Sequence, residues 1–527
     1  MSAPQVPSRS VGMDIAQEVS AMFRKPKVLA GLVLWLAPGA TCLGAVYVDA
    51  SAPGPVHDGA SWARAYRTIT QALDAAPVAA EVWVRTGTYH ERLSLSKHVS
   101  LYGGFLGCET AISQRLVGAF PTVIDAGGMG RGIDAMREQF VIIDGFTIRS
   151  GKADYGGGIR CETNADVKIR NCRIENCEAT VMGGGLYFGK YATGEMTDSV
   201  IVGCTAPRGG GAVIEYHCYP ITRRNVIIRN TATISGGGVY CPFHSGANLE
   251  NCTLAYNTAE VNGGAVYAYY GGPVQLNYCI VAYNAAPVAG GIFGDGGSSQ
   301  ATLTGNDWWQ NSGGDFGGWI VPPPPYLGNF AADPLFLMPD YDEYHLSVGS
   351  PCAGVGAFPL ESVYRLDRIG LAKMLPDGAA VNLTGKIVSC VDGGAAFIQD
   401  HDRSAGIAVV GLSGYQPRDV LASVEGTISS NARGEKVLLA TSASLHVRNV
   451  YQLKPLGVRV SMLGGASCLY ARTWGRAENV TPEGFDLSDG AGSVRVRWAG
   501  TVAEGQHVVA TGVYTAEGDF LAVDVGQ

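Results

Sequence analysis

The sequence is poor in charged residues and has no long apolar run after its first 45 residues. Asp, Glu, Lys and Arg make up only 16% of the 527 residues. No stretch after residue 45 has the roughly 20 consecutive apolar residues of a transmembrane helix, so we expect no membrane span. The net charge of −8 argues against a phosphate-binding surface on the whole molecule, and we expect no nucleic acid partner.

Motifs of nucleotide-dependent enzymes and of serine hydrolases are also missing. The sequence contains no P-loop, no dinucleotide-binding fingerprint and no nucleophile elbow. No pair of cysteines has the CxxC spacing of a zinc site, so we expect no metal and no cofactor. Several acidic turn residues could hold Ca²⁺ but more often simply form turns: Asp392, Asp400, Asp402, Asp486 and Asp489.

The N-terminus has the pattern of a secretory signal peptide. Residues 22–45 read MFRKPKVLAGLVLWLAPGATCLGA, in which three basic residues precede a short apolar run over 28–37 and then small residues. The apolar run is too short for a membrane span. We therefore expect residues 1–45 to be a signal peptide, with Met22 as an alternative start, and the protein to be secreted or at the cell surface. Cys42 leaves lipidation open as the alternative.

Glycine, in contrast, is abundant. The chain has 73 glycines, and they do not follow the strict Gly-X-Y period of collagen. Such a content predicts an all-β chain with many tight turns. A length of 527 residues exceeds one ordinary domain, so two or three domains are expected.

A repeat with a period of about 27 residues, within the range typical of solenoids, runs through the first part of the chain. Small-polar motifs that end in alanine start at five evenly spaced positions: Asn176, Gly203, Asn230, Asn257 and Asn284. Glycine clusters accompany them at 156–158, 183–185, 209–211, 236–238, 263–264 and 290–291. Between the glycines lie short strands with alternating apolar and polar residues. Such a strand cannot bury its apolar face alone, so each period predicts one coil of a parallel β-solenoid, with coils ~4.8 Å apart.

The recurring residues have structural roles in this prediction. Stacked asparagine side chains can hydrogen-bond from coil to coil at the turns, and glycines permit positive φ at sharp corners. Cys177 and Cys204 are separated by one period of the repeat, and so are Cys252 and Cys279. We interpret these cysteines as stacked core residues. Because adjacent coils lie within disulfide range, bridged pairs are the alternative.

Three segments resemble those of the right-handed parallel β-helix proteins of the pectin lyase-like superfamily, in a bacterial secreted form. Residues 47–76 are similar to the family's N-terminal strand and capping helix. Residues 82–105, with their Gly-Thr-Tyr turn, are similar to its first coil, and residues 332–356 to its closing segment. The resemblance implies a β-helix over 46–357 with an N-terminal capping helix. It implies little about activity, because this fold hosts lyases, hydrolases, epimerases and adhesins.

The C-terminal third contains two stretches that resemble each other. Residues 382–410 and 471–498 both read strand, turn, strand, turn, strand, and a β-hairpin follows each. About five short strands in ~80 residues fit a small Greek-key barrel, and the two stretches resemble tandem OB-fold modules. We therefore expect an OB-like β-barrel over 358–455 and a second over 456–527.

Aromatic and charged side chains follow the glycine corners of successive coils. If the corners stack, these side chains form a strip on which aromatic rings can stack on sugar rings. The alternative is that half of them point into the core. The residues that we expect to bind substrate are Tyr187, Tyr216, Tyr240, His244, Tyr267, Tyr269 and Asp295.

One stretch has residues suited to catalysis by a lyase. Glu215, His217 and Arg223 lie close in the sequence and would supply an acid or base and a cation that neutralises a uronate carboxylate. A glycosidase needs two carboxylates that flank one bond. Glu215 and Asp295 are three coils apart, roughly 14 Å, which is too far for that role.

We expect a monomeric β-helix protein that interacts with a polysaccharide or a cell-surface glycan and serves as a binding platform. The alternatives are a polysaccharide lyase or glycoside hydrolase that acts on an acidic polysaccharide near Glu215 and His217, and an adhesin. Charged groups that converge in a groove would favour the enzyme. Tyrosines without such groups would favour the platform.

Overall fold

The computed structural model describes residues 44–270, 272–296, 300–358, 363–392, 394–515 and 518–526. The expected signal peptide lies outside these residues except for Gly44 and Ala45, and Cys42 lies outside them as well. Within the described part of the chain, no helix has the length and apolar character needed to cross a bilayer.

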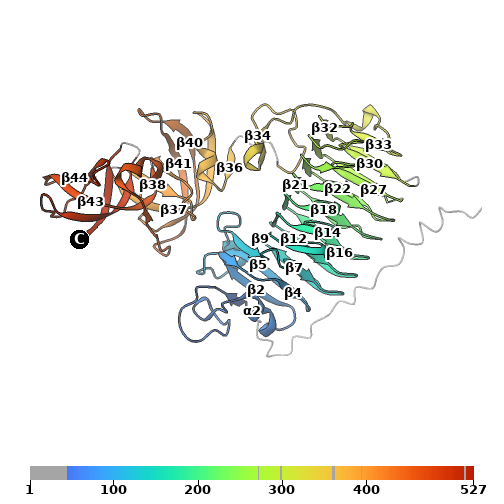
Figure 1. Ribbon diagram of the computed structural model, residues 1–527, viewed down its shortest axis with the longest axis horizontal. Coiled ribbons are helices and arrows are strands. Elements are labelled where there is room, and N and C mark those ends of the chain that lie inside the picture. Colours follow the sequence, from blue (N-terminus) through green and yellow to red (C-terminus); the bar gives the residue numbers. More distant parts are fainter. Residues whose placement is uncertain are drawn as a thin grey trace, which may run out of the picture. The chain divides into compact units, whose positions relative to one another are not determined.

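The repeats fold into a parallel β-solenoid, in which successive coils add strands to the same sheets (Figure 1). Sheet A consists of β1 (Val46–Val48), β2 (Ala80–Arg85), β5 (Val99–Phe105), β8 (Phe140–Asp144), β12 (Asp166–Arg170), β16 (Thr193–Thr197), β20 (Ile221–Arg223), β24 (Ala247–Glu250), β28 (Val274–Asn277) and β31 (Ala301–Thr304). Sheet B consists of β3 (Gly87–Tyr89), β6 (Thr122–Asp125), β9 (Phe146–Arg149), β13 (Arg173–Glu175), β17 (Val200–Val202), β21 (Val226–Ile228), β25 (Thr253–Ala255), β29 (Ile280–Ala282) and β32 (Asp307–Trp309).

Two further sheets complete the coils. Sheet D follows sheet B along the chain and consists of β10 (Lys152–Tyr155), β14 (Glu178–Met182), β18 (Thr205–Arg208), β22 (Thr231–Ser235) and β26 (Thr258–Ala259). Sheet C consists of β4 (Leu93–Leu95), β7 (Ile133–Ala135), β11 (Ile159–Cys161), β15 (Leu186–Phe188), β19 (Ala212–Ile214), β23 (Val239–Cys241), β27 (Val266–Tyr269), β30 (Ile292–Asp295) and β33 (Phe316–Gly318). The expected solenoid, with one coil for each period of the repeat, is therefore confirmed.

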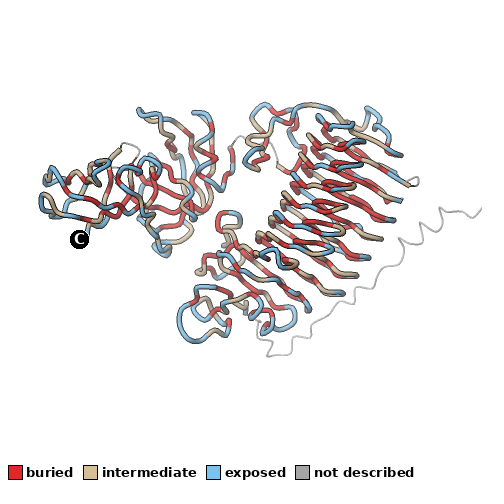
Figure 2. Tube along the Cα trace, viewed as in Figure 1, coloured by how far each residue is buried: buried red, intermediate tan, exposed pale blue. Residues whose placement is uncertain are grey.

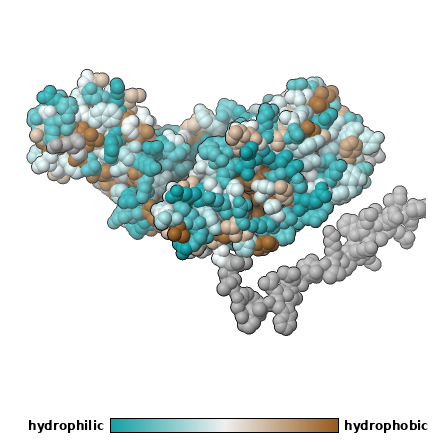
Figure 3. Space-filling model, turned by 60° about the horizontal axis from the view of Figure 1, so that its bottom comes forward, coloured by the Kyte–Doolittle hydropathy of each residue, from teal (hydrophilic) through white to brown (hydrophobic). Residues whose placement is uncertain are grey.

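The alternation within the strands directs one side of every coil into a continuous apolar core, seen as the buried stretches in Figure 2. In sheet A, strand pairing aligns buried residues from successive coils in one row: Ile143, Ile169, Met196, Thr222, Leu249, Leu276 and Leu303. Each buried large apolar side chain contributes roughly 1.5–3 kcal/mol. The surface is correspondingly polar, and on the face drawn in Figure 3 apolar residues form only scattered patches.

Helix α2 (Ile69–Ala75) lies against the first coils. The Thr68 side chain accepts a hydrogen bond from the Gln71 N–H at 3.2 Å and caps the helix. Glu91 accepts from two free N–H groups of the first turn, each at 2.8 Å. The apolar side of the helix packs into the solenoid core through Ile69, Ala72 and Leu73.

A ladder of asparagines crosses the coils at the corner between sheets B and D. Asn230 Nδ2 donates to Asn257 Oδ1, Asn257 Nδ2 to Asn284 Oδ1, and Asn284 Nδ2 to Asn311 Oδ1, each at 3.0 Å. All four side chains are buried. The predicted stacking of side-chain amides is therefore present from Asn230 onward.

The first two members of this ladder differ from the prediction. Strand pairing aligns Cys177 with Cys204, and Cys204 with Asn230, because the coil that joins the last two has 26 residues. Asn176 and Gly203 instead take left-handed positions just outside the ladder, with φ of 51° and 64°. The Cys204 N–H donates to Asn230 Oδ1 at 2.9 Å, so two thiols begin the row that the amides continue.

The cysteines of the repeat, among them Cys177, Cys204, Cys252 and Cys279, are free and buried thiols, and Cys108 is a free thiol that is only partly buried. Cys252 and Cys279 stack at the corner between sheets A and B. The Cys252 N–H donates to Cys279 Sγ at 3.5 Å, and the Cys279 N–H donates to Asn306 Oδ1 at 2.8 Å. These thiols are core residues in register, as we interpreted them from their spacing.

The glycine clusters have two separate roles at the corner between sheets D and C. Gly236 has φ of 71°, a conformation that favours glycine. A Cβ on Gly237 would lie 2.5 Å from the carbonyl oxygen of Gly264 in the next coil. The first glycine therefore makes the turn, and the second lets neighbouring coils approach closely.

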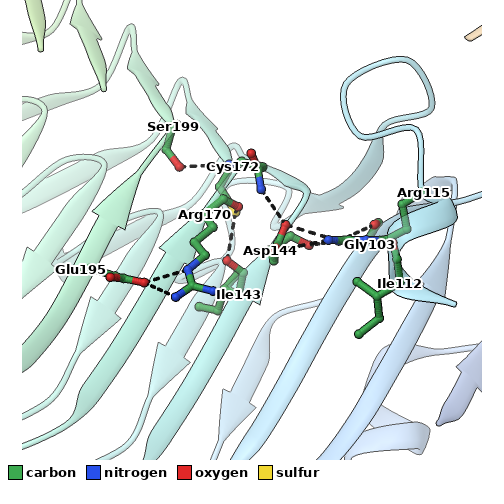
Figure 4. A network of polar contacts seen from close by, with 10 residues as sticks. Gly103, Ile112, Arg115, Ile143, Asp144, Arg170, Cys172, Glu195 and Ser199 are labelled. Carbon is green, nitrogen blue, oxygen red and sulfur yellow. Dashed lines mark hydrogen bonds and ion pairs between the residues drawn. The ribbon is translucent and has the colours of Figure 1, made fainter. Parts of the chain in front are cut away.

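The loop between β5 and β6, residues 106–121, is fastened to the solenoid by Arg115 (Figure 4). Arg115 Nη1 donates to the Gly103 carbonyl oxygen at 3.1 Å, and its guanidinium forms an ion pair with Asp144 at 3.3 Å. Both side chains of this pair are more than 90% buried. Asn171 of the next coil donates to the same carboxylate at 3.0 Å.

Beyond the solenoid, an antiparallel pair of strands, β34 (Phe336–Met338) and β35 (Glu343–Leu346), precedes two small sheets. Barrel 1 consists of β36 (Tyr364–Leu366), β37 (Ala380–Asp392), β38 (Ala395–Gln399), β39 (Gly406–Val410), β40 (Val420–Ser430) and β41 (Lys436–Val447). Barrel 2 consists of β42 (Leu456–Gly457), β43 (Tyr470–Thr481), β44 (Gly484–Ser488), β45 (Ser493–Arg497), β46 (His507–Tyr514) and β47 (Phe520–Gly526). The remaining helices among the described residues are short: α3 (Ile369–Ala372) and 3₁₀ helices at Trp62–Arg64, Ile112–Gln114, Pro325–Leu327, Pro339–Tyr341 and Val460–Ala466.

The two barrels share one topology. In barrel 1 the order is β37-β38-β39-β41-β40, and β40 pairs again with β37, so the five long strands close on themselves. Among these five strands β39 runs parallel to β41 and the other pairs are antiparallel, and the short β36 adds to β37 in parallel. Barrel 2 repeats this arrangement with β43 to β47. The internal similarity seen in the sequence therefore corresponds to two OB-like barrels.

Candidate functional site

Outward-facing side chains of sheet C form a column with one residue per coil. Strand pairing aligns Asp134, Arg160, Tyr187, Val213, Tyr240, Tyr267 and Phe293. The column is charged in its early coils and aromatic in its late coils. Because side chains alternate along a strand, the residue two positions further forms a second column beside it: Glu162, Gly189, Glu215, Pro242, Tyr269 and Asp295.

Arg160 lies at the centre of an ion-pair cluster in the early coils. Its Nη2 lies 2.6 Å from the Asp134 carboxylate and 2.6 Å from the Glu162 carboxylate. Arg131 contacts the same Asp134 at 3.1 Å. The hydrogen bond to Asp134 raises the pKa of Arg160, although partial burial opposes it. The cluster therefore places fixed charges on an otherwise weakly charged surface.

A hollow of about 360 Å³ lies over these two columns. It is lined by Arg137, Tyr155, Arg160, Glu162, Thr163, Tyr187, Gly189, Lys190 and Glu215. Gly189 has no side chain, and it therefore leaves a gap in the second column between Glu162 and Glu215. Burial raises the pKa of Glu215, and no described residue hydrogen-bonds to its carboxyl group or forms an ion pair with it. The hollow thus combines three cationic side chains, of which Arg160 is paired with Glu162, with a second carboxyl group, that of Glu215, which holds its proton more tightly than usual.

The late coils carry a stack of aromatic rings. The rings of Tyr240 and Tyr267 are stacked at 5.4 Å between centroids, and those of Tyr267 and Phe293 at 5.6 Å. The Tyr267 hydroxyl donates to the Asp295 carboxylate at 2.8 Å. Burial raises the pKa of Tyr240 to about 12. Tyr240 and Tyr267 are only 5% and 7% exposed, because rings one coil apart cover each other's faces. Their faces are not free to stack on a sugar, contrary to our expectation for these two residues.

A second aromatic group, the corner cluster, lies where the chain passes from sheet C to sheet A. Its members are the turn residues Tyr191, Tyr216, His217, Phe243, His244 and Tyr270 and the last residue of β27, Tyr269. His217 stacks between Tyr191 and His244, with ring centroids 5.6 and 5.7 Å away. Phe243 contacts Tyr270 at 6.2 Å. Tyr191, Phe243 and Tyr270 are 49%, 48% and 52% exposed. Aromatic surface that is open to a ligand therefore gathers at this corner.

The three expected catalytic residues occupy three different settings. Glu215 lies in the hollow. His217 belongs to the corner cluster, with its ring between two others. Arg223 lies on β20 in sheet A, where it forms an ion pair with Glu250 at 2.7 Å. The structure therefore does not bring these three side chains together as one catalytic group.

Of the expected binding residues, the structure assigns Tyr187 to the hollow, Tyr216, His244 and Tyr269 to the corner cluster, and Tyr240, Tyr267 and Asp295 to the ring stack. Arg160, Glu162 and Lys190 also line the hollow, and the aromatic pattern of the sequence did not single them out. The signal was present for Arg160, because it stands two residues after the glycine cluster 156–158, as Tyr187 does after 183–185.

The acidic turn residues considered for Ca²⁺ are engaged with other groups. Asp400 accepts from Lys386 Nζ at 2.7 Å in a buried pair. Asp486 and Asp392 form ion pairs with arginines. Asp489 and Asp402 accept backbone N–H groups within their own turns. The contacts of Asp489 and Asp402 are typical of turn formation.

Comparison with known families matches the solenoid. Residues 127–252 and 157–320 match the family model of the right handed beta helix region. The solenoid is thus similar to right-handed parallel β-helices, as the resemblance implied. No curated protein matches the chain. Among solved structures, the pectin methylesterase from Aspergillus niger in deglycosylated form is similar at 15% sequence identity, with a TM-score of 0.29, over 54% of this chain and 92% of that one.

Proposed function

We propose that this protein is an extracellular polysaccharide-binding protein, with the corner cluster and the hollow on sheet C as adjoining parts of one binding surface. The observation that carries the proposal is the open aromatic surface of the corner cluster, where successive coils contribute Tyr191, Phe243 and Tyr270, each about half exposed. Aromatic faces bury the apolar C–H face of a sugar ring, and tyrosine and histidine add hydrogen-bonding groups at the edge. A rigid row from consecutive coils suits an extended polymer.

The hollow supports an acidic polymer as the ligand. Arg137, Arg160 and Lys190 line it together. Charge-assisted hydrogen bonds from guanidinium and ammonium groups to carboxylates are about twice as strong as neutral ones. The hollow is also too small for more than part of a chain, so the remaining sugars would extend along the solenoid surface toward the corner cluster.

Affinity electrophoresis tests this proposal directly. The purified protein should be retarded in gels that contain polygalacturonate more strongly than in gels that contain a neutral glucan. Phe243→Ala should weaken the retardation, because Phe243 is exposed in the corner cluster. Tyr326→Ala is the matched control, since Tyr326 is 84% exposed and lies outside both parts of the surface. Equal retardation of all three proteins, or none in any gel, would contradict the proposal.

Cleavage by hydrolysis is the second candidate, and the arrangement of Glu162 and Glu215 favours it over elimination. They stand two coils apart in one column, ~9.6 Å between backbones, and the hollow lies between them. An inverting glycosidase has its carboxyl groups ~6.5–9.5 Å apart, so these two side chains would have to lean toward each other across the hollow. Glu215, with its raised pKa, would protonate the leaving oxygen, and Glu162, paired with Arg160, would activate water.

The two candidates are separated by product analysis. New reducing ends that appear without the ultraviolet absorbance of unsaturated uronates would indicate hydrolysis. Glu215→Gln should abolish these new ends while the protein still binds the polymer. Unsaturated ends would instead indicate a lyase and would contradict the role of Glu162 as a base toward water. Binding without new ends of either kind would leave the platform function alone.

A further inference from the structure

Loop 106–121 packs against barrel 1 through a small apolar cluster of its own. Leu106, Ala119 and Phe120 of the loop pack with Ile387 and Val420 of the barrel. The Phe120 ring lies 5.6 Å from the His401 ring. Segments that are far apart in the sequence are therefore in contact here, and polar groups of both meet at the edge of the cluster.

Three side chains of metal-ligand type converge at that edge. Cys108 and Glu109 come from the loop, and His446 comes from β41. Their sulfur, carboxylate and imidazole atoms all lie within 4.8 Å of one another. Glu109 Oε1 and His446 Nε2 are 3.6 Å apart, which is longer than a hydrogen bond. Two ligand atoms around a tetrahedral Zn²⁺ with bonds near 2.0–2.1 Å lie about 3.4 Å apart.

The Glu109 carboxylate is held in place before any ion binds. Oε1 accepts from the Leu106 N–H at 2.7 Å, and Oε2 accepts from the N–H groups of Gly107 and Cys108 at 3.0 Å each. These contacts fix the position of the carboxylate, and Oε1 faces His446 Nε2 across 3.6 Å.

The nearby charge of Arg85 does not oppose the binding of a cation at this edge of the cluster. Arg85 lies close to Gly107, and its charge is balanced by Asp49 at 2.7 Å. An ion that binds Cys108 Sγ would displace the thiol proton to solvent as the metal–sulfur bond forms.

We propose that Cys108 Sγ, Glu109 Oε1 and His446 Nε2 bind a divalent transition-metal ion of the Zn²⁺ type, with water as the fourth ligand. A mixed sulfur, nitrogen and oxygen donor set suits this borderline-soft ion and disfavours Ca²⁺ and Mg²⁺, which prefer oxygen alone. The bound ion would clamp barrel 1 to loop 106–121.

Cobalt substitution tests the site in the full chain. After treatment with a chelator, Co²⁺ should bind at one equivalent per chain and give the thiolate charge-transfer band and strong visible bands of a tetrahedral complex. Cys108→Ser should lose the charge-transfer band, and His446→Gln should lower the affinity at least tenfold. His507→Gln, which changes a histidine of barrel 2 outside the cluster, should behave as the unchanged protein.

A labelling experiment keeps the proposal falsifiable if either variant fails to fold. Cys108 is the accessible thiol among the described cysteines, so a maleimide should label it in the folded, unchanged protein, and Zn²⁺ should protect it. Labelling of Cys108 that is unaffected by Zn²⁺ would overturn the proposal. So would a Co²⁺ spectrum without a thiolate band, or a thiolate band that persists in folded Cys108→Ser.

Discussion

Asn230 and Asn257 are joined by two hydrogen bonds to a single oxygen. Asn257 Oδ1 accepts from Asn230 Nδ2 at 3.0 Å and from the Asn230 backbone N–H at 3.1 Å. The Asn257 amide in turn donates to the Ile227 carbonyl oxygen at 2.8 Å. One buried side chain therefore satisfies main-chain and side-chain groups at a corner where the sheets offer no partner.

Removal of this side chain should cost more than one hydrogen bond. We expect Asn257→Ala to lower the free energy of unfolding by about 2–4 kcal/mol, because it leaves buried donors of Asn230 and the Ile227 carbonyl unpaired. Urea denaturation followed by tryptophan fluorescence measures the loss. Asn248→Ala is the control, since the Asn248 side chain makes no hydrogen bond among the described residues, and a change within about 0.5 kcal/mol is expected. Equal losses would contradict the role of the ladder.

An added methyl group should also destabilise the solenoid where neighbouring coils come closest. In Gly237→Ala the new Cβ would meet the Thr258 and Gly264 carbonyl oxygens at 2.4 and 2.5 Å. Backbone atoms cannot move aside without displacing the next coil, so we expect a loss of at least about 1–3 kcal/mol in the urea midpoint experiment. Gly464→Ala should be neutral, because its Cβ would meet no atom within 4 Å. A soluble Gly237→Ala protein with an unchanged midpoint would show that the coils are less tightly packed than described.

The solenoid could be predicted from the sequence because its determinants are local and repeated. Each coil carries its own alternating strands and its own turn glycines, so five copies of the pattern reinforce one another. The alignment of individual residues was less predictable. The ladder begins with Cys177 and Cys204 rather than Asn176 and Gly203, because one coil is a residue shorter and the exact pairing depends on which residues hydrogen-bond.

The residues of the candidate site were harder to predict than the fold, because their burial and contacts depend on how coils and domains pack. The burial of Tyr240 and Tyr267 depends on ring stacking between coils, which spacing alone does not reveal. The aromatic pattern did not include Arg160, although its position two residues after a glycine cluster predicts that its side chain lies on the same face of sheet C as Tyr187. The meeting of Cys108 with His446 depends on how barrel 1 packs against loop 106–121, and no sequence period connects the two.

The charged part of the proposed binding surface can be tested apart from the aromatic part. We expect Arg160→Gln to weaken binding of polygalacturonate tenfold or more, since a charge-assisted hydrogen bond is worth about 1.5–3 kcal/mol, and to leave binding of neutral glucans unchanged. Isothermal titration calorimetry with oligosaccharides of each kind measures both. Arg223→Gln removes the same charge from sheet A, where Arg223 pairs with Glu250, and should change neither. An equal loss in both arginine variants would indicate a general charge effect rather than a site.

Asp307 should make the solenoid less stable as pH rises. This carboxyl group is fully buried in β32, and burial raises its pKa from 3.8 to about 6. Below pH ~4 it is protonated in both folded and unfolded chains and contributes nothing to pH dependence. Between pH ~4 and ~6 the unfolded chain loses its proton first, so the unfolded state is favoured and stability falls, by about 3 kcal/mol at most above pH 6.

Asp307→Asn should remove that fall. The asparagine keeps an oxygen for the Ala332 N–H, which donates to Asp307 Oδ1 at 2.9 Å, and it carries no charge to bury. We therefore expect the variant to be more stable than the unchanged protein at pH 8 and to lose this advantage near pH 4, when urea midpoints are compared across the range. Asp340→Asn, at a side chain 95% exposed, should show no such dependence. The prediction fails if the difference in urea midpoint between Asp307→Asn and the unchanged protein stays constant from pH 4 to pH 8. That result would mean that Asp307 titrates near its ordinary pKa and that water reaches its carboxyl group.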